Sequence, residues 1–244
     1  MSPEQALLAI SLVDLTNLDD RCTADAVAAL CTRAAEHGVA AVCVWPDFVP
    51  QAAAVLAGTG VGVATVVNFP TGDERPYAVS AVAGCAVDDG ATEVDVVLPY
   101  RALLAGDTAW VLDVLRTARV ASVGTHLKVI LETGELPDQD TVAAAARLAI
   151  EAGADFVKTS TGKSPVSATP EAVATMLDVI AGTDHTVGLK PSGGIRTAAD
   201  AEVYLALAAE RMGTDYLAPA TFRFGASSLL DALIDVTNGV SPGG

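Results

Sequence analysis

The sequence is poor in several residue types, and each shortage excludes a class of protein. Its 244 residues include only three histidines and four cysteines, and no two cysteines form a C-x-x-C pair. This argues against a structural zinc site or a disulfide framework, so we expect free thiols. No apolar run reaches membrane-spanning length without a charge, and the first residues, MSPEQALLAISLVDL, carry no basic segment. We therefore expect a cytoplasmic protein that makes no membrane contact.

Positive charge is also scarce. The formal net charge of −16 would repel nucleic acid, so we expect no nucleic-acid partner. There are only four lysines against ten arginines, and three of them lie inside apolar, strand-like runs: HLKVILE, DFVKTS and VGLKPS. A general preference for arginine would explain which lysines are missing, but not where the remaining ones lie.

Apolar, strand-like segments alternate with helical ones along the whole chain. Thr23 is a typical N-cap for a helix that ends at Gly38. After a short helix over residues 3–9, we expect strands at 10–15, 39–45, 61–68, 93–98, 126–132, 155–159, 186–191 and 222–226. We expect the alternating helices at 23–37, 50–57, 75–89, 108–123, 138–152, 170–180, 197–212 and 227–236. Alternation at this length favours one α/β domain over residues 1–244, a single (β/α)8 TIM barrel with a short N-terminal helix, over a doubly wound open sheet.

The charged residues within the predicted strands are unusual for buried segments. In a barrel of this type the functional groups lie at the carboxyl ends of the strands. We therefore expect one mouth of the barrel to collect Asp14, Asp95, Lys128, Glu132, Lys158 and Lys190.

Lys158 and Lys190 are the candidates for chemistry at that mouth. A lysine with the ordinary pKa of ~10.4 is almost wholly protonated near neutrality, and only the neutral amine attacks a carbonyl. Burial and a neighbouring cation can lower that pKa, and these two lysines end adjacent predicted strands. A salt bridge with a carboxylate is the alternative, and for Lys128 it is the favoured one.

The carboxylates offer proton transfer or charge balance. Strand alternation places Glu93, Asp95 and Val97 on one face, so Asp95 can point into the barrel and act through a water or a substrate hydroxyl. Asp14 could pair with a lysine or bind a hydroxyl. Balancing the charge of the buried lysines is the alternative role for both, and the two roles overlap.

Three predicted loops have the composition of a phosphate site. Two follow strands seven and eight, where barrels commonly bind phosphate through free backbone N–H groups and a helix N-terminus. Tight turns alone would also explain the small residues. The candidate residues are Gly162, Lys163, Gly193, Gly194, Ser227 and Ser228.

Ordered motifs across the chain give it a family resemblance. They are VDLTNLDD, AAVCVWP, ATVVNFPTGD, GATEVDVVLPYRALLAGD, LKVILETGEL, GADFVKTSTGK, VGLKPSGGIRTAADA and FRFGASSLL. With these segments the sequence resembles the deoxyribose-phosphate aldolases, which are class I, Schiff-base aldolases.

The resemblance implies reversible cleavage of 2-deoxy-D-ribose 5-phosphate to D-glyceraldehyde 3-phosphate and acetaldehyde in deoxyribonucleoside catabolism, without metal or cofactor. It implies that Lys158 forms the Schiff base, that Lys190 lowers its pKa and that Asp95 relays protons. Asp14, Thr16 and Lys128 would belong to the surrounding substrate network.

The sequence departs from the family pattern at two places. Ser192 stands where the family usually has alanine, which we expect to adjust phosphate binding only. The chain ends in VTNGVSPGG, without the terminal tyrosine that assists proton transfer in several members.

Two other functions stay open: a Schiff-base aldolase for another phosphorylated aldehyde, and a barrel that only binds a sugar phosphate. A homodimer is also open, because apolar helix faces could pack against a second subunit.

Overall fold

The strands of the protein form one ring of parallel pairs in the computed structural model, which describes residues 1–240. They are β1 (Val13–Asn17), β2 (Ala41–Val44), β3 (Gly62–Val67), β4 (Glu93–Val97), β5 (His126–Ile130), β6 (Phe156–Lys158), β7 (Gly188–Lys190) and β8 (Phe224–Ala226). Their order is β7-β6-β5-β4-β3-β2-β1-β8. Isolated parallel bridges from Leu189 to Phe222 and from Ser192 to Gly225 join the two ends of this order.

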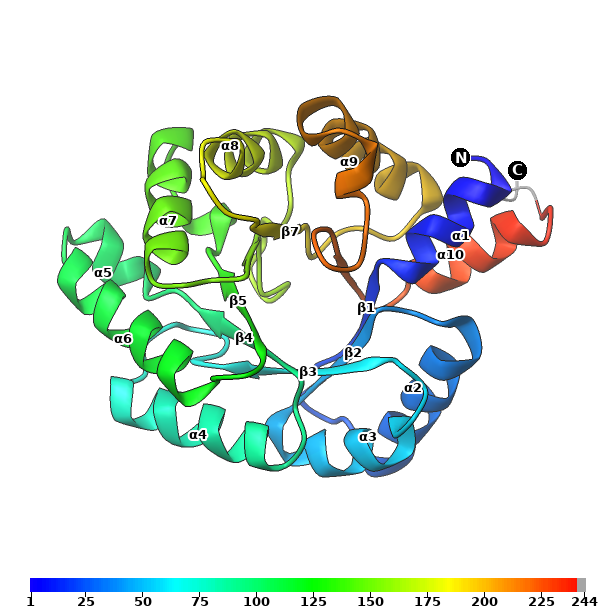
Figure 1. Ribbon diagram of the computed structural model, residues 1–244, viewed down its shortest axis with the longest axis horizontal. Coiled ribbons are helices and arrows are strands. Elements are labelled where there is room, and N and C mark those ends of the chain that lie inside the picture. The colour runs from blue at the N-terminus through cyan, green and yellow to red at the C-terminus, as the bar shows by residue number, and fades with distance from the viewer. Residues whose placement is uncertain (241–244) are drawn as a thin grey trace.

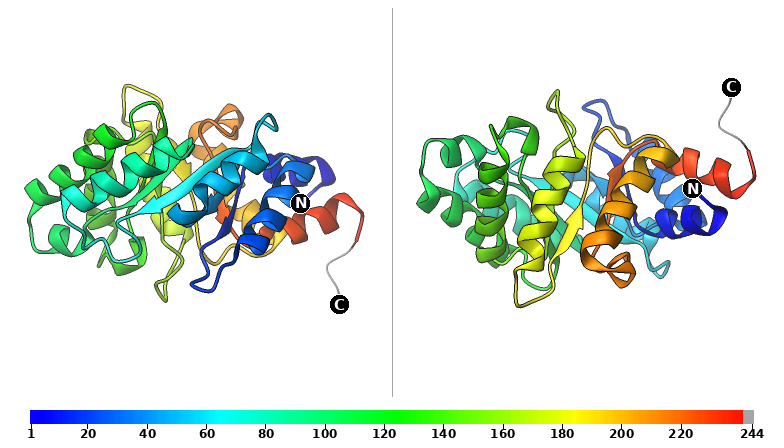
Figure 2. Two further views of the ribbon diagram at one scale, coloured as in Figure 1. Left: turned by 90° about the horizontal axis from the view of Figure 1, so that it is seen from below. Right: turned by 90° about the horizontal axis from the view of Figure 1, so that it is seen from above.

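The helices surround the strands on the outside, as Figures 1 and 2 show. They are α1 (Pro3–Ser11), α2 (Ala24–His37), α3 (Val49–Leu56), α4 (Pro76–Asp88), α5 (Tyr100–Leu104), α6 (Thr108–Ala121), α7 (Gln139–Glu151), α8 (Pro170–Ala181), α9 (Ala198–Met212) and α10 (Leu229–Thr237). The chain therefore folds as the predicted (β/α)8 TIM barrel preceded by a helix.

Local sequence signals explain where several helices begin and end. Thr23 Oγ1 accepts a hydrogen bond from the Ala26 N–H at 3.2 Å, and Gly38 ends α2 in the left-handed conformation with φ of 65°. Thr197 and Asp200 form a capping box at the start of α9. Each cap satisfies backbone groups that a helix end would leave without a partner.

Most observed strands are shorter than predicted by one to three residues, and the chain ends show larger differences. The first helix continues to Ser11, so β1 begins at Val13 instead of residue 10, and Asp14 lies near the start of that strand. The short helix α5 was not predicted. The last helix begins at Leu229 instead of residue 227, so Ser227 and Ser228 lie between β8 and α10. Residues 241–244, which belong to the predicted C-terminal tail, lie outside the described residues.

The buried residues of the strands face two different environments. On β3, Val63 and Val67 pack outward in the main hydrophobic core beneath the helices, whereas Ala64 and Val66 belong to a small separate cluster with Cys43. This is the alternation expected of a barrel strand. The barrel interior therefore holds little apolar volume on this side, and its other side is filled by charged groups.

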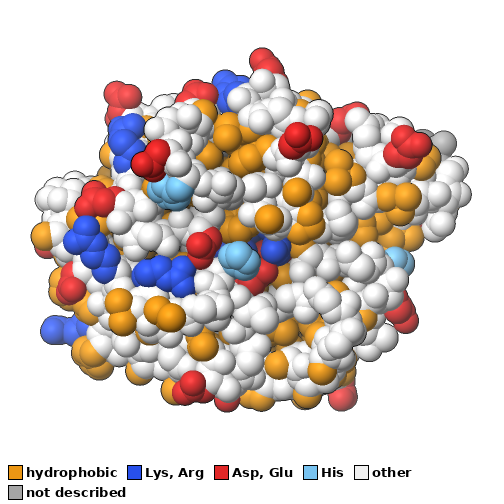
Figure 3. Space-filling view, viewed as in Figure 1, with side chains coloured by type: hydrophobic (Ala, Val, Ile, Leu, Met, Phe, Trp, Pro, Cys, Tyr) orange, Lys and Arg blue, Asp and Glu red, His pale blue; other side chains and the backbone are white. Residues whose placement is uncertain are grey.

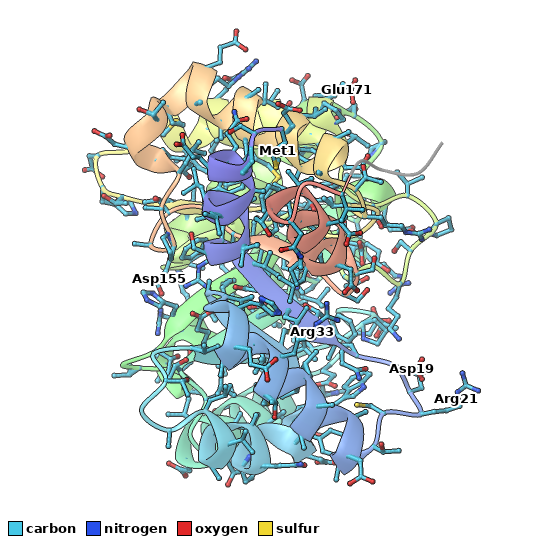
Figure 4. The ribbon with its side chains drawn as sticks, turned by 90° about the vertical axis from the view of Figure 1, so that its right-hand side faces the viewer. Met1, Asp19, Arg21, Arg33, Asp155 and Glu171 are labelled. Carbon is cyan, nitrogen blue, oxygen red and sulfur yellow. The ribbon has the colours of Figure 1, made fainter. Side chains whose placement is uncertain are left out.

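The two ends of the barrel are distinct. Asp155, which precedes β6, lies at the opposite end from Asp19 and Arg21, which follow β1 (Figure 4). Figure 3 shows acidic and basic side chains spread over one face between hydrophobic ones. Near the chain ends α1 packs beside α10 (Figure 1). Among residues 1–240 there is no helix with the length and apolar character that a bilayer crossing requires.

Candidate active site

Strand register brings the predicted catalytic side chains together inside the barrel. Lys158 on β6 lies directly opposite Lys190 on β7, and Asp95 on β4 lies opposite Lys128 on β5. The exposed fraction of each of these four residues is 2% or less. Four charged groups thus share an interior from which water is almost excluded, and each needs a charged partner.

Asp95 is the centre of this network. Its Oδ2 accepts hydrogen bonds from the ammonium groups of Lys158 and Lys190, each at 2.8 Å. Its Oδ1 accepts one from Lys128 at 3.0 Å. Burial alone would raise the pKa of Asp95, but the three lysines hold it well below its ordinary value. Asp95 is therefore an anion that fixes the positions of three amines.

Asp14 provides the second carboxylate for Lys190. Its Oδ2 lies 2.6 Å from Lys190 Nζ and 3.6 Å from Lys128 Nζ, and its Oδ1 accepts from Arg223 at 2.6 Å. Burial would raise the pKa of Asp14, yet the charges of Lys190, Arg223 and Lys128 lower it. Asp14 therefore stays ionised and holds the Lys190 ammonium group in place through an ion pair.

The pKa values of the three buried lysines are shifted in different directions. Burial lowers the pKa of Lys158, and Lys190 lowers it further against the opposing effect of Asp95. For Lys190 and Lys128 burial acts in the same direction, but carboxylates outweigh it: Asp14 and Asp95 raise the pKa of Lys190, and Asp95 and Glu93 raise that of Lys128. Lys158 is thus the amine that most easily becomes neutral and nucleophilic.

A cavity of about 880 Å³ opens above this network. Lys158 lines it, whereas Asp14, Asp95, Lys128 and Lys190 do not. A carbonyl compound in the cavity would therefore meet the Lys158 amine, with the other charged groups beneath it. The residues predicted to bind phosphate also line this cavity: Gly162, Lys163, Gly193, Gly194, Ser227 and Ser228.

The glycines of the predicted phosphate loops adopt a backbone conformation that favours glycine. Gly193 and Gly194 have φ values of 84° and 80°, which residues with a Cβ rarely adopt. A Cβ on Gly193 would come within 2.5 Å of Ser167 Oγ, so the loops pack closely there. Ser228 precedes the first residue of α10, whose N-terminal N–H groups can receive an anion.

Lys163 and Thr16 occupy the rim of the cavity in different ways. Lys163 Nζ donates to the Leu18 carbonyl at 2.8 Å and to Asp20 at 3.2 Å, so its charge is held by the loop after β1. The Thr16 hydroxyl donates to the Asp14 carbonyl at 2.9 Å. These two contacts leave one N–H of the ammonium group for another acceptor.

Glu132 is a further buried carboxylate near Lys158, and it has no cation partner within 4.0 Å among the described residues. It follows β5 with φ of 54°, and it accepts the Thr161 N–H at 3.2 Å and the Thr161 hydroxyl at 2.5 Å. Burial raises its pKa. Its observed contacts hold the loop that carries Gly162 and Lys163.

Sequence reasoning missed Arg223 and gave Glu93 no role. Arg223 precedes β8, and its guanidinium donates to both Asp14 and Glu93 inside the barrel. Glu93 also accepts from Lys128. The alternation of β4 places Glu93 beside Asp95, which was the available signal. No local pattern around Arg223 indicates that it turns inward.

In the described part of the chain, His, Cys, Asp and Glu side chains form no group that could hold a metal ion.

Known proteins resemble this chain in sequence and in fold. Residues 8–234 match the family described as DeoC/LacD family aldolase. A deoxyribose-phosphate aldolase of Agrobacterium fabrum is 48% identical over 243 residues, which cover 98% of this chain and 94% of the relative.

Two solved structures have the same fold over nearly their whole length. A Toxoplasma gondii protein, provisionally assigned as a deoxyribose-phosphate aldolase, has a TM-score of 0.89 at 28% identity and 97% coverage of both chains. The deoxyribose phosphate aldolase of Aeropyrum pernix, described as tetrameric, has a TM-score of 0.79 at 28% identity, covering 96% of this chain and 92% of its own. The family match and the 48% identical relative establish that the chain belongs to the DeoC/LacD family of aldolases.

Proposed function

We propose that the protein is a class I aldolase that reversibly cleaves 2-deoxy-D-ribose 5-phosphate to D-glyceraldehyde 3-phosphate and acetaldehyde. The observation that carries the proposal is the position of Lys158, which alone among the buried lysines of the described chain lines the cavity and whose pKa is lowered. The name of the Agrobacterium fabrum relative supports the choice of substrate.

The first steps use the neutral amine of Lys158. Its nitrogen attacks C1 of the open-chain sugar, and loss of water from the carbinolamine gives a protonated imine. The imine can accept the electron pair of the C2–C3 bond. Asp95 lies 2.8 Å from this nitrogen and stabilises the positive charge that the imine carries.

Cleavage then requires that the C3 hydroxyl lose its proton. As this proton leaves, C3 becomes the aldehyde carbon of glyceraldehyde 3-phosphate, and C1 and C2 remain on Lys158 as an enamine. Asp95 is wholly buried and is a weak base, because three lysines lower its pKa. We propose that it takes part through a water or through the substrate hydroxyl. Protonation of the enamine at C2 and hydrolysis of the imine release acetaldehyde and regenerate the amine.

The loops at the far side of the cavity would hold the 5-phosphate. Gly193, Gly194 and the start of α10 offer backbone N–H groups, and Ser227 and Ser228 offer hydroxyls. Lys163 would add a positive charge. With the phosphate held there, only a sugar phosphate with the right distance between its carbonyl carbon and its phosphate can place that carbon at the Lys158 amine.

The proposal is tested by an aldolase assay with deoxyribose 5-phosphate in the presence of a chelator, together with borohydride trapping. We expect turnover to continue and a mass increase on the peptide that contains Lys158. The matched control is Lys158→Met, which should lose both the adduct and turnover. Activity without an adduct on Lys158 would rule out the mechanism, and an adduct without turnover would indicate another aldehyde substrate.

We also infer that the protein forms a homodimer. Leu7 on α1 and Val203 on α9 are 60% and 48% exposed, and the Met1 amine pairs with Glu202 at 3.1 Å, which joins these two helices. A second copy would remove this apolar surface from water. Light scattering after size-exclusion chromatography should give the mass of two chains, and the mass of a single chain would contradict the inference.

A further inference from the structure

Arg223 lies inside the barrel, and each nitrogen of its guanidinium donates a hydrogen bond. Nη1 donates to Asp14 Oδ1 at 2.6 Å, Nη2 donates to Glu93 Oε1 at 3.0 Å, and Nε donates to the Pro219 carbonyl. Its Cζ lies 5.7 Å from the centre of the Phe156 ring. Arg223 is only 5% exposed, so it is a fixed interior charge.

Each of the three network carboxylates is shared between cations. Asp14 contacts Arg223, Lys190 and Lys128. Glu93 contacts Arg223 and Lys128. Asp95 contacts Lys128, Lys158 and Lys190. Within the described chain, Lys158 therefore has Asp95 as its one carboxylate partner, and it shares that partner with two other lysines.

The charges in this network do not balance. The cations are Lys128, Lys158, Lys190 and Arg223, and the carboxylates of the described chain within 4.0 Å of them are Asp14, Glu93 and Asp95. Full ionisation would leave one surplus positive charge in a dry interior, which is unfavourable. The surplus is removed if one cation loses its proton, and a guanidinium does not do so at accessible pH.

We propose that Arg223 is a positioning residue for the Schiff-base reaction: by occupying Asp14 and Glu93, it leaves the buried cations one carboxylate short, so that Lys158 gives up its proton. The inference rests on the proposed function of Lys158. Without Arg223, three lysines would face three carboxylates, and each could keep its proton. Arg223 thus acts on Lys158 through Asp14, Lys190 and Asp95 without touching the cavity.

Three further titratable groups lie around Lys158 outside these ion pairs. Cys43 on β2 is a buried thiol whose pKa is raised by burial. Glu132 accepts from Thr161 and has no cation within 4.0 Å in the described chain, and burial raises its pKa against the opposing charge of Lys158. Lys163, which lines the same cavity, is paired with Asp20. The ring of His126 on β5 packs edge-on against Phe156, whose ring also lies near the Arg223 guanidinium.

The test uses two variants that change the charge of the network, two that keep it, and one readout. The readout is the pH dependence of the rate at which acetaldehyde and cyanoborohydride label Lys158, followed by mass spectrometry. Arg223→Met balances the network, so the midpoint should move to higher pH. If the midpoint rises by about one pH unit, labelling at neutral pH should fall about tenfold, because the fraction of neutral amine falls by that factor. Glu93→Gln adds to the surplus, so its midpoint should move to lower pH.

The double variant Arg223→Met/Glu93→Gln provides the matched control. It removes one charge of each sign and keeps the surplus of one, so its midpoint should return towards that of the unmodified protein. Arg223→Lys keeps the charge and should leave the midpoint near its original value. A residue that only supports the fold would shift both single variants in the same direction, and that result would overturn the inference.

The variants separate failure of this inference from failure of the proposed function. If Arg223→Met does not fold, the downward shift of Glu93→Gln and its reversal in the double variant still decide the question. If Lys158 is labelled but the pH midpoints of the variants do not follow the charge of the network, the role of Arg223 is refuted. The aldolase proposal then stays intact. No labelling of Lys158 in the unmodified protein would refute the aldolase mechanism itself.

Discussion

Replacement of Lys190 by methionine tests most directly how this protein activates its nucleophile. The ammonium groups of Lys158 and Lys190 each lie 2.8 Å from Asp95 Oδ2, so their nitrogens cannot be more than twice that distance apart. Two unit charges at roughly 5 Å repel each other by about 3 kcal/mol at an effective dielectric constant of about 20. Lys190→Met removes this repulsion and leaves Asp95 Oδ2 to Lys158 alone.

Both effects favour the protonated form of Lys158. Because each 1.4 kcal/mol is a factor of about ten, a change of about 3 kcal/mol lowers the fraction of neutral amine about a hundredfold at a fixed pH below the new pKa. We therefore expect kcat/KM for deoxyribose 5-phosphate near neutrality to fall by about that factor and to recover as the pH is raised.

The assay is the pH profile of kcat/KM, combined with borohydride labelling of Lys158. Arg116→Met is a matched control, because it removes a cation from an exposed ion pair with Glu151 on the outside of the barrel. Exposed pairs contribute little, so this profile should stay unchanged. A Lys190→Met enzyme that lost activity equally at every pH would show that Lys190 does not act through the charge of Lys158.

Three further predictions concern the phosphate loops and stability. Ser228→Asp places a negative charge at the start of α10, so KM for the phosphorylated sugar should rise at least about tenfold while turnover of unphosphorylated deoxyribose changes little; equal losses would remove the phosphate assignment. Thr197→Ala removes the capping box of α9 and should cost about 1 kcal/mol of unfolding free energy in urea, whereas an unchanged midpoint would contradict the cap. Because the pKa values of Asp14 and Asp95 lie below their ordinary values, the stability they contribute is complete above about pH 4 and is lost as the pH falls further. Urea midpoints that already dropped between neutrality and that pH would count against this ion network as the cause.

Much of the fold could be predicted because the local signals agree with the tertiary structure. The N-cap at Thr23, the stop at Gly38 and the apolar runs at the other strands follow from local backbone chemistry. The first strand was placed too early, because Ile10 and Ser11 extend the amphipathic helix α1. An apolar run next to a helix can continue either element, and only its packing partners decide which.

The site divides in the same way. The sequence placed Lys158 and Lys190 at the ends of adjacent strands, and the register confirms this pairing. It could not show which carboxylate each lysine shares, because those contacts depend on the stagger between strands that lie far apart in the chain. For the same reason the inward turn of Arg223 was missed.

The sequence by itself determined the alternation of strands and helices and the family, and it singled out Lys158, which lines the cavity, because periodicity and motif order are properties of the chain. Only the tertiary structure decided the charge count inside the barrel. Burial inside the ring lowers the pKa of Lys158, and Lys190 on β7 lowers it further against the opposing charge of Asp95 on β4. That balance exists only when the ring of strands brings these side chains together.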